Sequence, residues 1–237
     1  MPNATICLPT YNEAANIEPM LHALEPLNVR VLVIDDNSPD GTGRIADRLA
    51  SELGFVSVLH RDRKEGLGPA YIAGFRRALE TDTELILEMD CDFSHDPADV
   101  ARLIAACDAG ADLALGSRYV DGGATEHWGR GRRLVSTGGS WYARMLLGVH
   151  IRDLTGGFKC YHRRVLERID LRAIRSRGYA FQIETTYRAL RAGFTVVEVP
   201  IVFSDRTRGT SKMSRAIVLE AVSRVPSLRF EALTGRI

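Results

Sequence analysis

Short apolar segments alternate with helical segments through the first half of the chain, and this alternation restricts the fold more than any other feature. Segments rich in Val, Ile and Leu are typical of strands that are buried on both faces. Their alternation with helices predicts a mainly parallel α/β sheet that helices cover on both sides. The predicted strands are 4–9, 29–36, 55–60, 85–90 and 112–119, and the predicted helices are about 13–24, 41–53, 68–79 and 96–107.

The second half of the chain is less regular. There we predict, in order, a loop at 121–133, a helix at 133–147, a turn at 153–161, a helix near 180–192, a strand at 194–203, a polar loop at 206–212 and a last helix at about 213–225. A chain of 237 residues is long enough for one large domain or two small ones. Since no repeat and no linker stand out, we expect one domain, 1–211, followed by a C-terminal amphipathic extension, 212–237.

Composition and charge exclude several classes of protein. The net charge is +1, so no overall basic field favours nucleic acid as a partner. The four cysteines are widely spaced without a CxxC pair, which indicates reduced thiols in a cytoplasmic protein rather than a zinc site or a disulfide framework. The N-terminus does not resemble a signal peptide, and no stretch approaches the roughly 20 apolar residues of a membrane span. We therefore expect any membrane contact to be peripheral, on the cytoplasmic face.

Polar clusters follow three of the predicted strands. The first strand ends in Pro9-Thr10-Tyr11-Asn12-Glu13, the second in Asp35-Asp36, and the fourth in Asp90 and Asp92. Ligands of parallel sheets bind beyond the carboxyl ends of the strands. We therefore expect the three clusters to converge on one crevice.

The motif MDCDFSHDP places two aspartates one residue apart at the end of an apolar strand. A charged pair at the edge of a core costs free energy unless something compensates it. Hard divalent cations prefer carboxylate oxygens and often share their coordination with phosphates. Asp90 and Asp92 are therefore candidates for anchoring a metal–diphosphate, with Cys91 packing inward. A strand-end turn in which Asp96 caps the next helix is the simpler alternative.

Two further motifs each give only weak evidence of a binding site when taken alone. In IDDNSPDGT, an aspartate at the strand end can accept a hydrogen bond from a base or a ribose, and Ser38 to Gly41 have turn chemistry. In LPTYNE, Tyr11 offers a face for stacking and Glu13 an acceptor for ribose hydroxyls, although Asn12 could equally be a helix cap. The segment 63–74 is rich in glycine but contains no phosphate-binding GxxxxGK[ST] motif.

Taken together, the motifs indicate a family much more specifically than any one of them does alone. In chain order they are PTYNE, DDNSPDGT, EGLGPAYIAGF, MDCDFSHDP, GSRY, DLTGGFKCY and RTRGTSKM. Over about residues 4–220 the chain resembles the family-2 glycosyltransferases of the GT-A fold, and most closely the polyprenyl (dolichyl) phosphate mannose synthases. The resemblance implies a Rossmann-like nucleotide-binding half and transfer of mannose, with inversion, from GDP-mannose to a polyprenyl monophosphate.

The resemblance also implies a donor site and a metal, Mg²⁺ or Mn²⁺. Many relatives have Gln where this chain has Ser94, and the shorter serine leaves either direct or water-mediated metal contact open. The implied metal ligands are Asp90, Asp92 and Ser94. The implied nucleotide-sugar site is Pro9, Tyr11, Glu13, Ile34, Asp36, Asp90, Cys91 (through its backbone), Asp92, Arg206 and Lys212.

The acceptor would be a phosphate, which is already ionised near neutral pH and needs no strong base. It needs cations that orient it, and Arg can bind phosphate oxygens with two donors. The segment 122–152 contains five arginines and one acidic residue. By the family's pattern the acceptor phosphate meets Arg118, Arg132 and Ser136, and the residues expected to act in catalysis are Asp92, Arg118, Arg132, Ser136, Arg206 and Lys212.

Two segments have the character of membrane-surface helices. Residues 134–148 are largely apolar and contain Trp141 and Tyr142, which favour membrane interfaces. The last helix combines an apolar side with Lys212, Arg215, Arg224 and Arg229. Packing of both helices against the sheet is the alternative, and a membrane-anchoring partner protein is a further expectation.

Three other functions compete with this one. The chain could transfer glucose or another sugar, either to a polyprenyl phosphate or to a soluble acceptor, where Asp153 would be the candidate base. It could be a non-catalytic nucleotide-binding regulator or scaffold at a membrane, which would not need the full set of charge-stabilising residues. A nucleotidyltransferase is disfavoured, because PTYNE is not the Gly-rich Arg-Lys signature of those enzymes.

Overall fold

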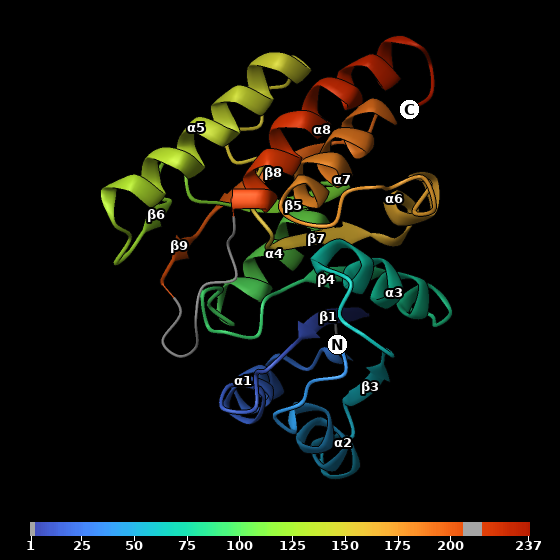
Figure 1. Ribbon diagram of the computed structural model, residues 1–237. Helices are drawn as coiled ribbons and strands as arrows, with labels where there is room; N and C mark the ends of the chain where they lie inside the picture. Colours follow the sequence, from blue (N-terminus) through green and yellow to red (C-terminus); the bar gives the residue numbers. More distant parts are fainter. Residues whose placement is uncertain (1–2, 206–214) are drawn as a thin grey trace.

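The computed structural model describes residues 3–205 and 215–237; the side chains of Arg130, Arg132, residues 215–219 and Ala221 are outside the description. Seven strands form one sheet in the order β3-β2-β1-β4-β7-β5-β8 (Figure 1). The strands are β1 (Ala4–Thr10), β2 (Arg30–Asp35), β3 (Val56–His60), β4 (Leu85–Glu88), β5 (Leu113–Ser117), β7 (Lys159–His162) and β8 (Val196–Pro200). All neighbours are parallel except β7, which is antiparallel to both β4 and β5.

Strand β1 lies between β2 and β4, so the chain proceeds from β1 to one side of the sheet and then crosses to the other. This reversal of strand order is where open α/β sheets form their ligand crevice. The registers pair Thr10 with Asp35 and Cys7 with Glu88. The polar residues that follow β1, β2 and β4 therefore meet at one edge of the sheet.

Helices cover both faces of the sheet, as the sequence predicts. One face is covered by α1 (Ile17–Leu24), α2 (Thr42–Glu52) and α4 (Asp99–Asp108), whose apolar residues share a core with β1, β2 and β4. A short 3-10 turn, η1 (Glu25–Leu27), follows α1. The opposite face is covered by α3 (Leu67–Leu79), α6 (Arg163–Arg168) and part of α7 (Ala180–Arg191).

Two long helices form an outer layer on α7. They are α5 (Arg130–Leu147) and α8 (Arg215–Leu233), and they lie alongside each other in Figure 1. Ala143 and Leu147 of α5 share a third core with Val225, Leu228 and Ala232 of α8. This packing contributes apolar burial that offsets the hydrogen bond lost at Pro226, and α8 continues past the predicted end at Val225. The division into a domain of 1–211 and an extension of 212–237 stays a prediction.

The structure corrects three predictions in the second half of the chain and adds one helix. The turn predicted over 153–161 contains the start of β7, a strand that the sequence hides because it is four residues long and carries a lysine. The helix α6 was not predicted. The loop at 121–133 contains β6 (Ala124–Thr125) and the first residues of α5. The strand predicted over 194–203 is divided into β8 and β9 (Val202–Phe203), and β9 pairs with β6 in parallel.

Gly68, in the first turn of α3, allows a close approach of two backbones. A Cβ atom at this position would lie 2.4 Å from the carbonyl oxygen of Ser176 and 3.0 Å from the ring of Phe181. Overpacking of this kind costs a protein about 2 kcal/mol. We expect Gly68→Ala to lower the free energy of unfolding by that amount in urea denaturation. Gly54→Ala is the matched control, since its Cβ would meet nothing within 4 Å. Equal stability of the two variants would contradict the prediction.

Candidate functional site at the carboxyl edge of the sheet

A cavity of about 480 Å³ lies beyond the carboxyl ends of the central strands. Its wall contains residues from the loops after β1, β2 and β4, from the end of β5, and from α5 and α7. The convergence that the sequence predicts is confirmed, because the cavity is lined by Pro9, Tyr11, Glu13, Asp36, Asp90, Cys91, Asp92, Ser94, Arg118 and Ser136.

The turn after β4 presents two carboxylates to this cavity. The hydroxyl of Tyr71 donates to Asp90 Oδ1 at 3.3 Å, and the backbone N–H of Ser94 donates to Asp92 Oδ1 at 3.1 Å. Phe93, between Asp92 and Ser94, has a φ of 61°, a left-handed conformation that is rare for a bulky residue and that is often found at functional sites. Cys91 is buried in the core, as expected.

The ring of His95 holds the same turn in place. Its Nδ1 accepts a hydrogen bond from the Asp90 N–H at 3.1 Å, and its ring stacks on Phe158 with centroids 4.7 Å apart. Burial lowers the pKa of His95 to about 4, so the ring is neutral at pH 7 and can act as an acceptor. Nothing in the sequence pattern predicts this role for His95.

The donor atoms fit a hard divalent cation. Asp90 and Asp92 supply carboxylate oxygens, and the buried Ser94 Oγ lines the cavity without a hydrogen-bond partner in the part of the chain that the structure describes. Mg²⁺ and Mn²⁺ take such oxygen ligands and complete their coordination with water or phosphate oxygens. Within residues 3–205 and 215–237, no three His, Cys, Asp or Glu side chains gather to enclose a metal by themselves.

The loop after β1 is held in place by the motif SPDGT. Ser38 Oγ accepts from the N–H of Asn12, Thr42 Oγ1 from that of Glu13, and Asp40 Oδ2 from that of Ala14, at 2.9–3.1 Å. The sequence predicts only a local turn for these side chains, because their partners lie 26 to 29 residues upstream. Asn12 is not a helix cap but a left-handed turn residue, with a φ of 57°.

The other residues of the predicted nucleotide site lie in different environments, some at the cavity wall and one in the core. Lys64 Nζ lies 4.0 Å from the centroid of the Tyr11 ring. Burial raises the pKa of Asp36, and Arg61, which donates to its Oδ1 at 2.5 Å, opposes that shift. Ile34 is fully buried in the core and is not among the cavity-lining residues. Its predicted contact with a ligand remains a prediction.

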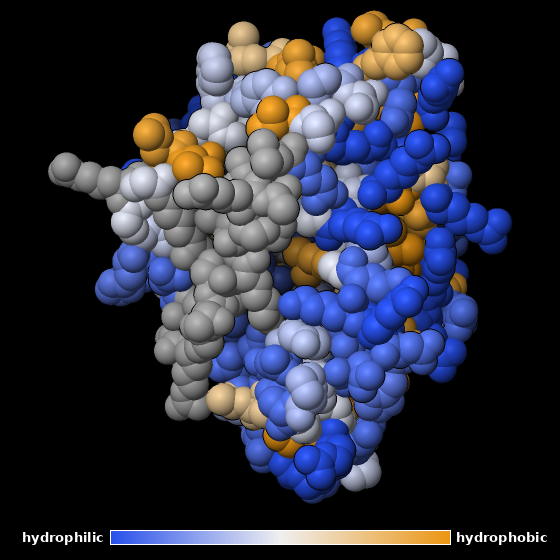
Figure 2. Space-filling view, in the orientation of Figure 1, coloured by the Kyte–Doolittle hydropathy of each residue, from blue (hydrophilic) through white to orange (hydrophobic). Residues whose placement is uncertain are grey.

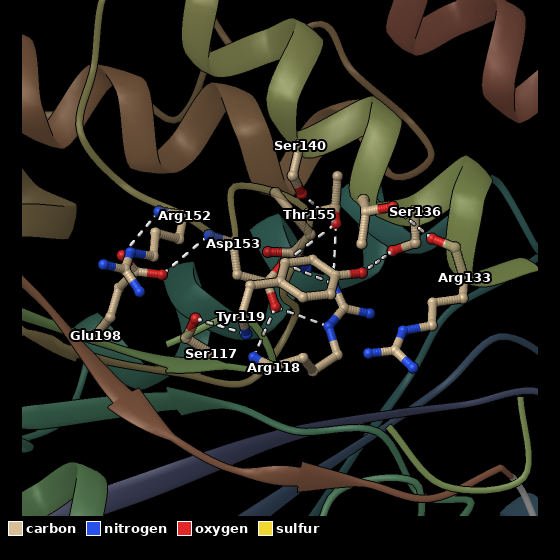
Figure 3. A network of polar contacts seen from close by, with 12 residues as sticks. Ser117, Arg118, Tyr119, Arg133, Ser136, Ser140, Arg152, Asp153, Thr155 and Glu198 are labelled. Carbon is tan, nitrogen blue, oxygen red and sulfur yellow. Dashed lines mark hydrogen bonds and ion pairs between the residues drawn. The ribbon is translucent and has the colours of Figure 1, made fainter. Parts of the chain in front are cut away.

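Arg118, which also lines the cavity, forms a buried ion pair with Asp153 (Figure 3). Its Nε donates to Asp153 Oδ2 at 2.7 Å, and its Nη2 donates to Asp153 Oδ1 at 2.6 Å and to Thr155 Oγ1 at 2.9 Å. The backbone N–H of Arg118 also donates to Asp153 Oδ2. Both oxygens of Asp153 are thus engaged by one guanidinium, which supports a structural role for Asp153 and disfavours it as a base.

The remaining predicted residues are described only in part. Ser136 lies in α5, and its Oγ accepts a hydrogen bond from the hydroxyl of Tyr119 at 2.8 Å. Arg132 lies in the first turn of the same helix, but its side chain is outside the description. Arg206 and Lys212 lie outside the described residues.

A buried polar network that the sequence did not reveal lies next to the cavity. Lys159 Nζ donates to the carbonyl and to the Oε1 of Gln182, and to the Oγ1 of Thr185. Tyr161 donates to Glu88 Oε1 at 2.7 Å. Burial lowers the pKa of Lys159 to about 8 and raises that of Glu88. Because Gln182 lines the cavity, this network supports its wall from inside the sheet.

Comparisons with known proteins agree with this geometry. The profile of the family described as "Glycosyl transferase family 2" matches residues 5–170. Polyprenol monophosphomannose synthase of Mycolicibacterium smegmatis is 49% identical over 224 residues, which cover 93% of this chain and 84% of that protein. Undecaprenyl-phosphate mannosyltransferase of Micrococcus luteus is 46% identical over 236 residues, 97% of each chain.

Among solved structures, glucosyl-3-phosphoglycerate synthase from Mycobacterium tuberculosis, in complex with Mn²⁺ and UDP-glucose, superposes with a TM-score of 0.70. It is 20% identical, and the match covers 96% of this chain and 79% of that one. At this identity the likeness concerns the fold alone, and it confirms the expected GT-A fold. The relatives confirm the resemblance to the polyprenyl phosphate mannose synthases.

Removing the cation of the buried network should destabilise the protein strongly. Lys159→Met would leave Glu88 without the positive charge that opposes its burial and Gln182 Oε1 without its donor. Leaving a buried charge without its compensating charge costs about 3 kcal/mol or more. We expect that loss in the free energy of unfolding, measured in urea. Arg191→Met removes an exposed cation from α7 and should change stability little. The role given to Lys159 would be wrong if both variants were equally stable.

Proposed function

Because the chain belongs to glycosyl transferase family 2, we propose that it transfers mannose from GDP-mannose to a polyprenyl monophosphate, giving a lipid-linked mannose donor. The observation that carries this proposal is that one cavity is lined both by two carboxylates, Asp90 and Asp92, and by Arg118 and Ser136. Paired carboxylates suit a metal–diphosphate, and a guanidinium with a hydroxyl suits a second, separate phosphate.

The donor half of the proposal concerns charge on the leaving group. Asp90 and Asp92, with Ser94 directly or through water, would hold Mg²⁺ or Mn²⁺ against the diphosphate. Such a cation neutralises the negative charge that develops on a departing nucleoside diphosphate. The loop of Pro9, Tyr11 and Glu13, together with Asp36, would bind the nucleoside. Arg206 and Lys212 are assigned to the phosphates on the family's pattern.

In the acceptor half of the proposal, the protein must orient the acceptor phosphate and needs no base to deprotonate it. A phosphate monoester is ionised near pH 7 and is its own nucleophile. Arg118, Arg132 and Ser136 would bind its oxygens, and Asp153 would hold the Arg118 guanidinium in one orientation. No carboxylate beside these residues is required to accept a proton, which agrees with the engagement of both Asp153 oxygens.

The surface beside the cavity suits a lipid acceptor. Leu134, Trp141 and Met145 of α5 are 74%, 63% and 64% exposed, and their spacing of seven and four residues places them on one side of the helix. Val222, Phe230 and Leu233 of α8 are also exposed. Figure 2 shows apolar side chains along the upper part of the molecule, where α5 and α8 lie. We call these six side chains the apolar surface.

The apolar surface supports peripheral contact with a membrane, alone or with an anchoring partner protein. Among the described residues, no helix is both long enough and apolar enough to pass through a bilayer. Trp and Leu on one side of a helix, with arginines on others, are typical of helices that lie in the lipid interface. The four cysteines are all free and buried, which is compatible with a reducing compartment and hence with the cytoplasmic face.

Sugar transfer tests the proposed reaction directly. Radiolabelled GDP-mannose and a short polyprenyl phosphate in detergent should give organic-extractable label with Mg²⁺ or Mn²⁺ and none with excess chelator. Asp92→Asn should lower kcat about 100-fold or more, because charge stabilisation of a leaving group is typically worth that much. Asp96→Asn, an exposed helix-flanking residue four positions away, should retain activity. Label from UDP-glucose but not from GDP-mannose would exclude mannose, and no transfer from either would exclude a polyprenyl phosphate acceptor.

Membrane contact is tested separately by co-sedimentation with vesicles that contain anionic phospholipid. Replacing two members of the apolar surface, in Leu134→Ser/Trp141→Ser, should lower the bound fraction about tenfold, because each loses interfacial apolar contact. Val202→Ser replaces an exposed apolar residue of β9, outside both helices, and should bind like the natural protein. Unchanged binding of the double variant would show that this surface does not meet the membrane.

A further inference from the structure

Tyr119 connects the end of β5 to α5 beside the proposed acceptor site. It directly follows Arg118, and its hydroxyl donates to Ser136 Oγ at 2.8 Å (Figure 3). Tyr119 is the last residue of the motif GSRY and has no part in the proposed function above. Yet it contacts both of the described residues, Arg118 and Ser136, that are proposed to bind the acceptor phosphate.

The hydrogen bond from Tyr119 determines what Ser136 can do. A serine hydroxyl has one proton to donate and two lone pairs that accept. Since the phenol occupies one lone pair, the serine proton is directed elsewhere. In the part of the chain that the structure describes, that proton has no acceptor within hydrogen-bond distance. Ser136 lines the cavity, so its proton is available to a ligand there.

Thr137, the residue after Ser136, shows how a hydroxyl within a helix is usually hydrogen-bonded. Hydroxyls within helices commonly donate to a backbone carbonyl one turn earlier. Thr137 does so, donating to the carbonyl of Arg133 at 2.8 Å. Ser136 forms no such bond to a described carbonyl. Its hydroxyl is therefore oriented by Tyr119 rather than by its own helix.

The ring of Tyr119 also contacts Arg118. The guanidinium carbon lies 5.2 Å from the ring centroid, and Asp153 engages the Nε and Nη2 of the same guanidinium. Arg118 is thus confined by an aromatic face and by a carboxylate. Burial raises the pKa of Tyr119, so the phenol keeps its proton at neutral pH.

From this geometry we infer that Tyr119 is a positioning residue for the acceptor phosphate: its hydroxyl makes Ser136 a hydrogen-bond donor, and its ring holds Arg118 beside it. Oxygens of a deprotonated phosphate can only accept hydrogen bonds, so a serine fixed as a donor is complementary to them. The inference rests on the proposed function, since it names how the same site positions its second substrate.

Tyr119→Phe tests the inference, because it keeps the ring and removes only the hydroxyl. With the natural protein transferring mannose to a short polyprenyl phosphate in detergent, the variant should raise the KM for the lipid phosphate about tenfold, the typical value of one hydrogen bond to a charged group. The KM for GDP-mannose should not change. Tyr142→Phe is the matched control, since that phenol donates to the carbonyl of Val222, and Tyr142 does not line the cavity.

A double-mutant cycle with Ser136→Ala separates positioning from direct contact. If Tyr119 acts through Ser136, Tyr119→Phe should change the lipid KM by less than twofold in the Ser136→Ala background. An unchanged lipid KM in the single variant, or the same tenfold rise in both backgrounds, would overturn the inference while the active natural protein upholds the proposed function. A natural protein that transfers no sugar to polyprenyl phosphate would overturn both. Thermal midpoints equal to that of the natural protein confirm that each variant is folded.

Discussion

The carboxylate of Asp153 is the group on which the acceptor side of the cavity depends. It is fully buried, and it binds the backbone and the guanidinium of Arg118. Its own backbone N–H is held by Glu198 of β8. One residue therefore connects the end of β5, through its carboxylate, with the strand β8, through its backbone N–H. Without it Arg118 would be a buried cation with no counter-charge, which costs several kcal/mol.

The donor side is organised mainly by contacts to backbone N–H groups, with one ion pair between Arg61 and Asp36. Ser38, Asp40 and Thr42 bind three successive N–H groups of the loop after β1, and His95 binds the N–H of Asp90. The carboxylates that face the cavity are thus placed by groups that are themselves fixed. Hydrogen bonds in a cavity wall that water reaches poorly are strong, and they hold the site close to one geometry.

The sequence was informative where local patterns and general rules of topology suffice. Apolar strands and alternating helices predict β1 to β5, and the rule for parallel sheets predicts that Tyr11, Asp36 and Asp92 share one crevice. Prediction from the sequence failed where a residue's role depends on a partner far away in the chain. Strand β7 is short and contains Lys159, whose charge is tolerated only because Gln182 and Thr185, 23 and 26 residues away, accept from it. Ser38 and Tyr119 likewise depend on contacts with other segments, whereas Arg206 and Lys212 rest on resemblance alone.

Helix α5 takes part in both the cavity and the outer surface. Val135, Ser136 and Gly139 line the cavity, whereas Leu134, Trp141 and Met145 are exposed on the same rigid helix. Ser136 and Trp141 are five residues apart, about 7–8 Å along the axis. If α5 lies in the plane of a lipid interface, this interval sets the lateral distance between the membrane contact and the point at which a lipid's phosphate is received. The seating of the protein on the membrane and the alignment of the second substrate would then be determined by one rigid helix.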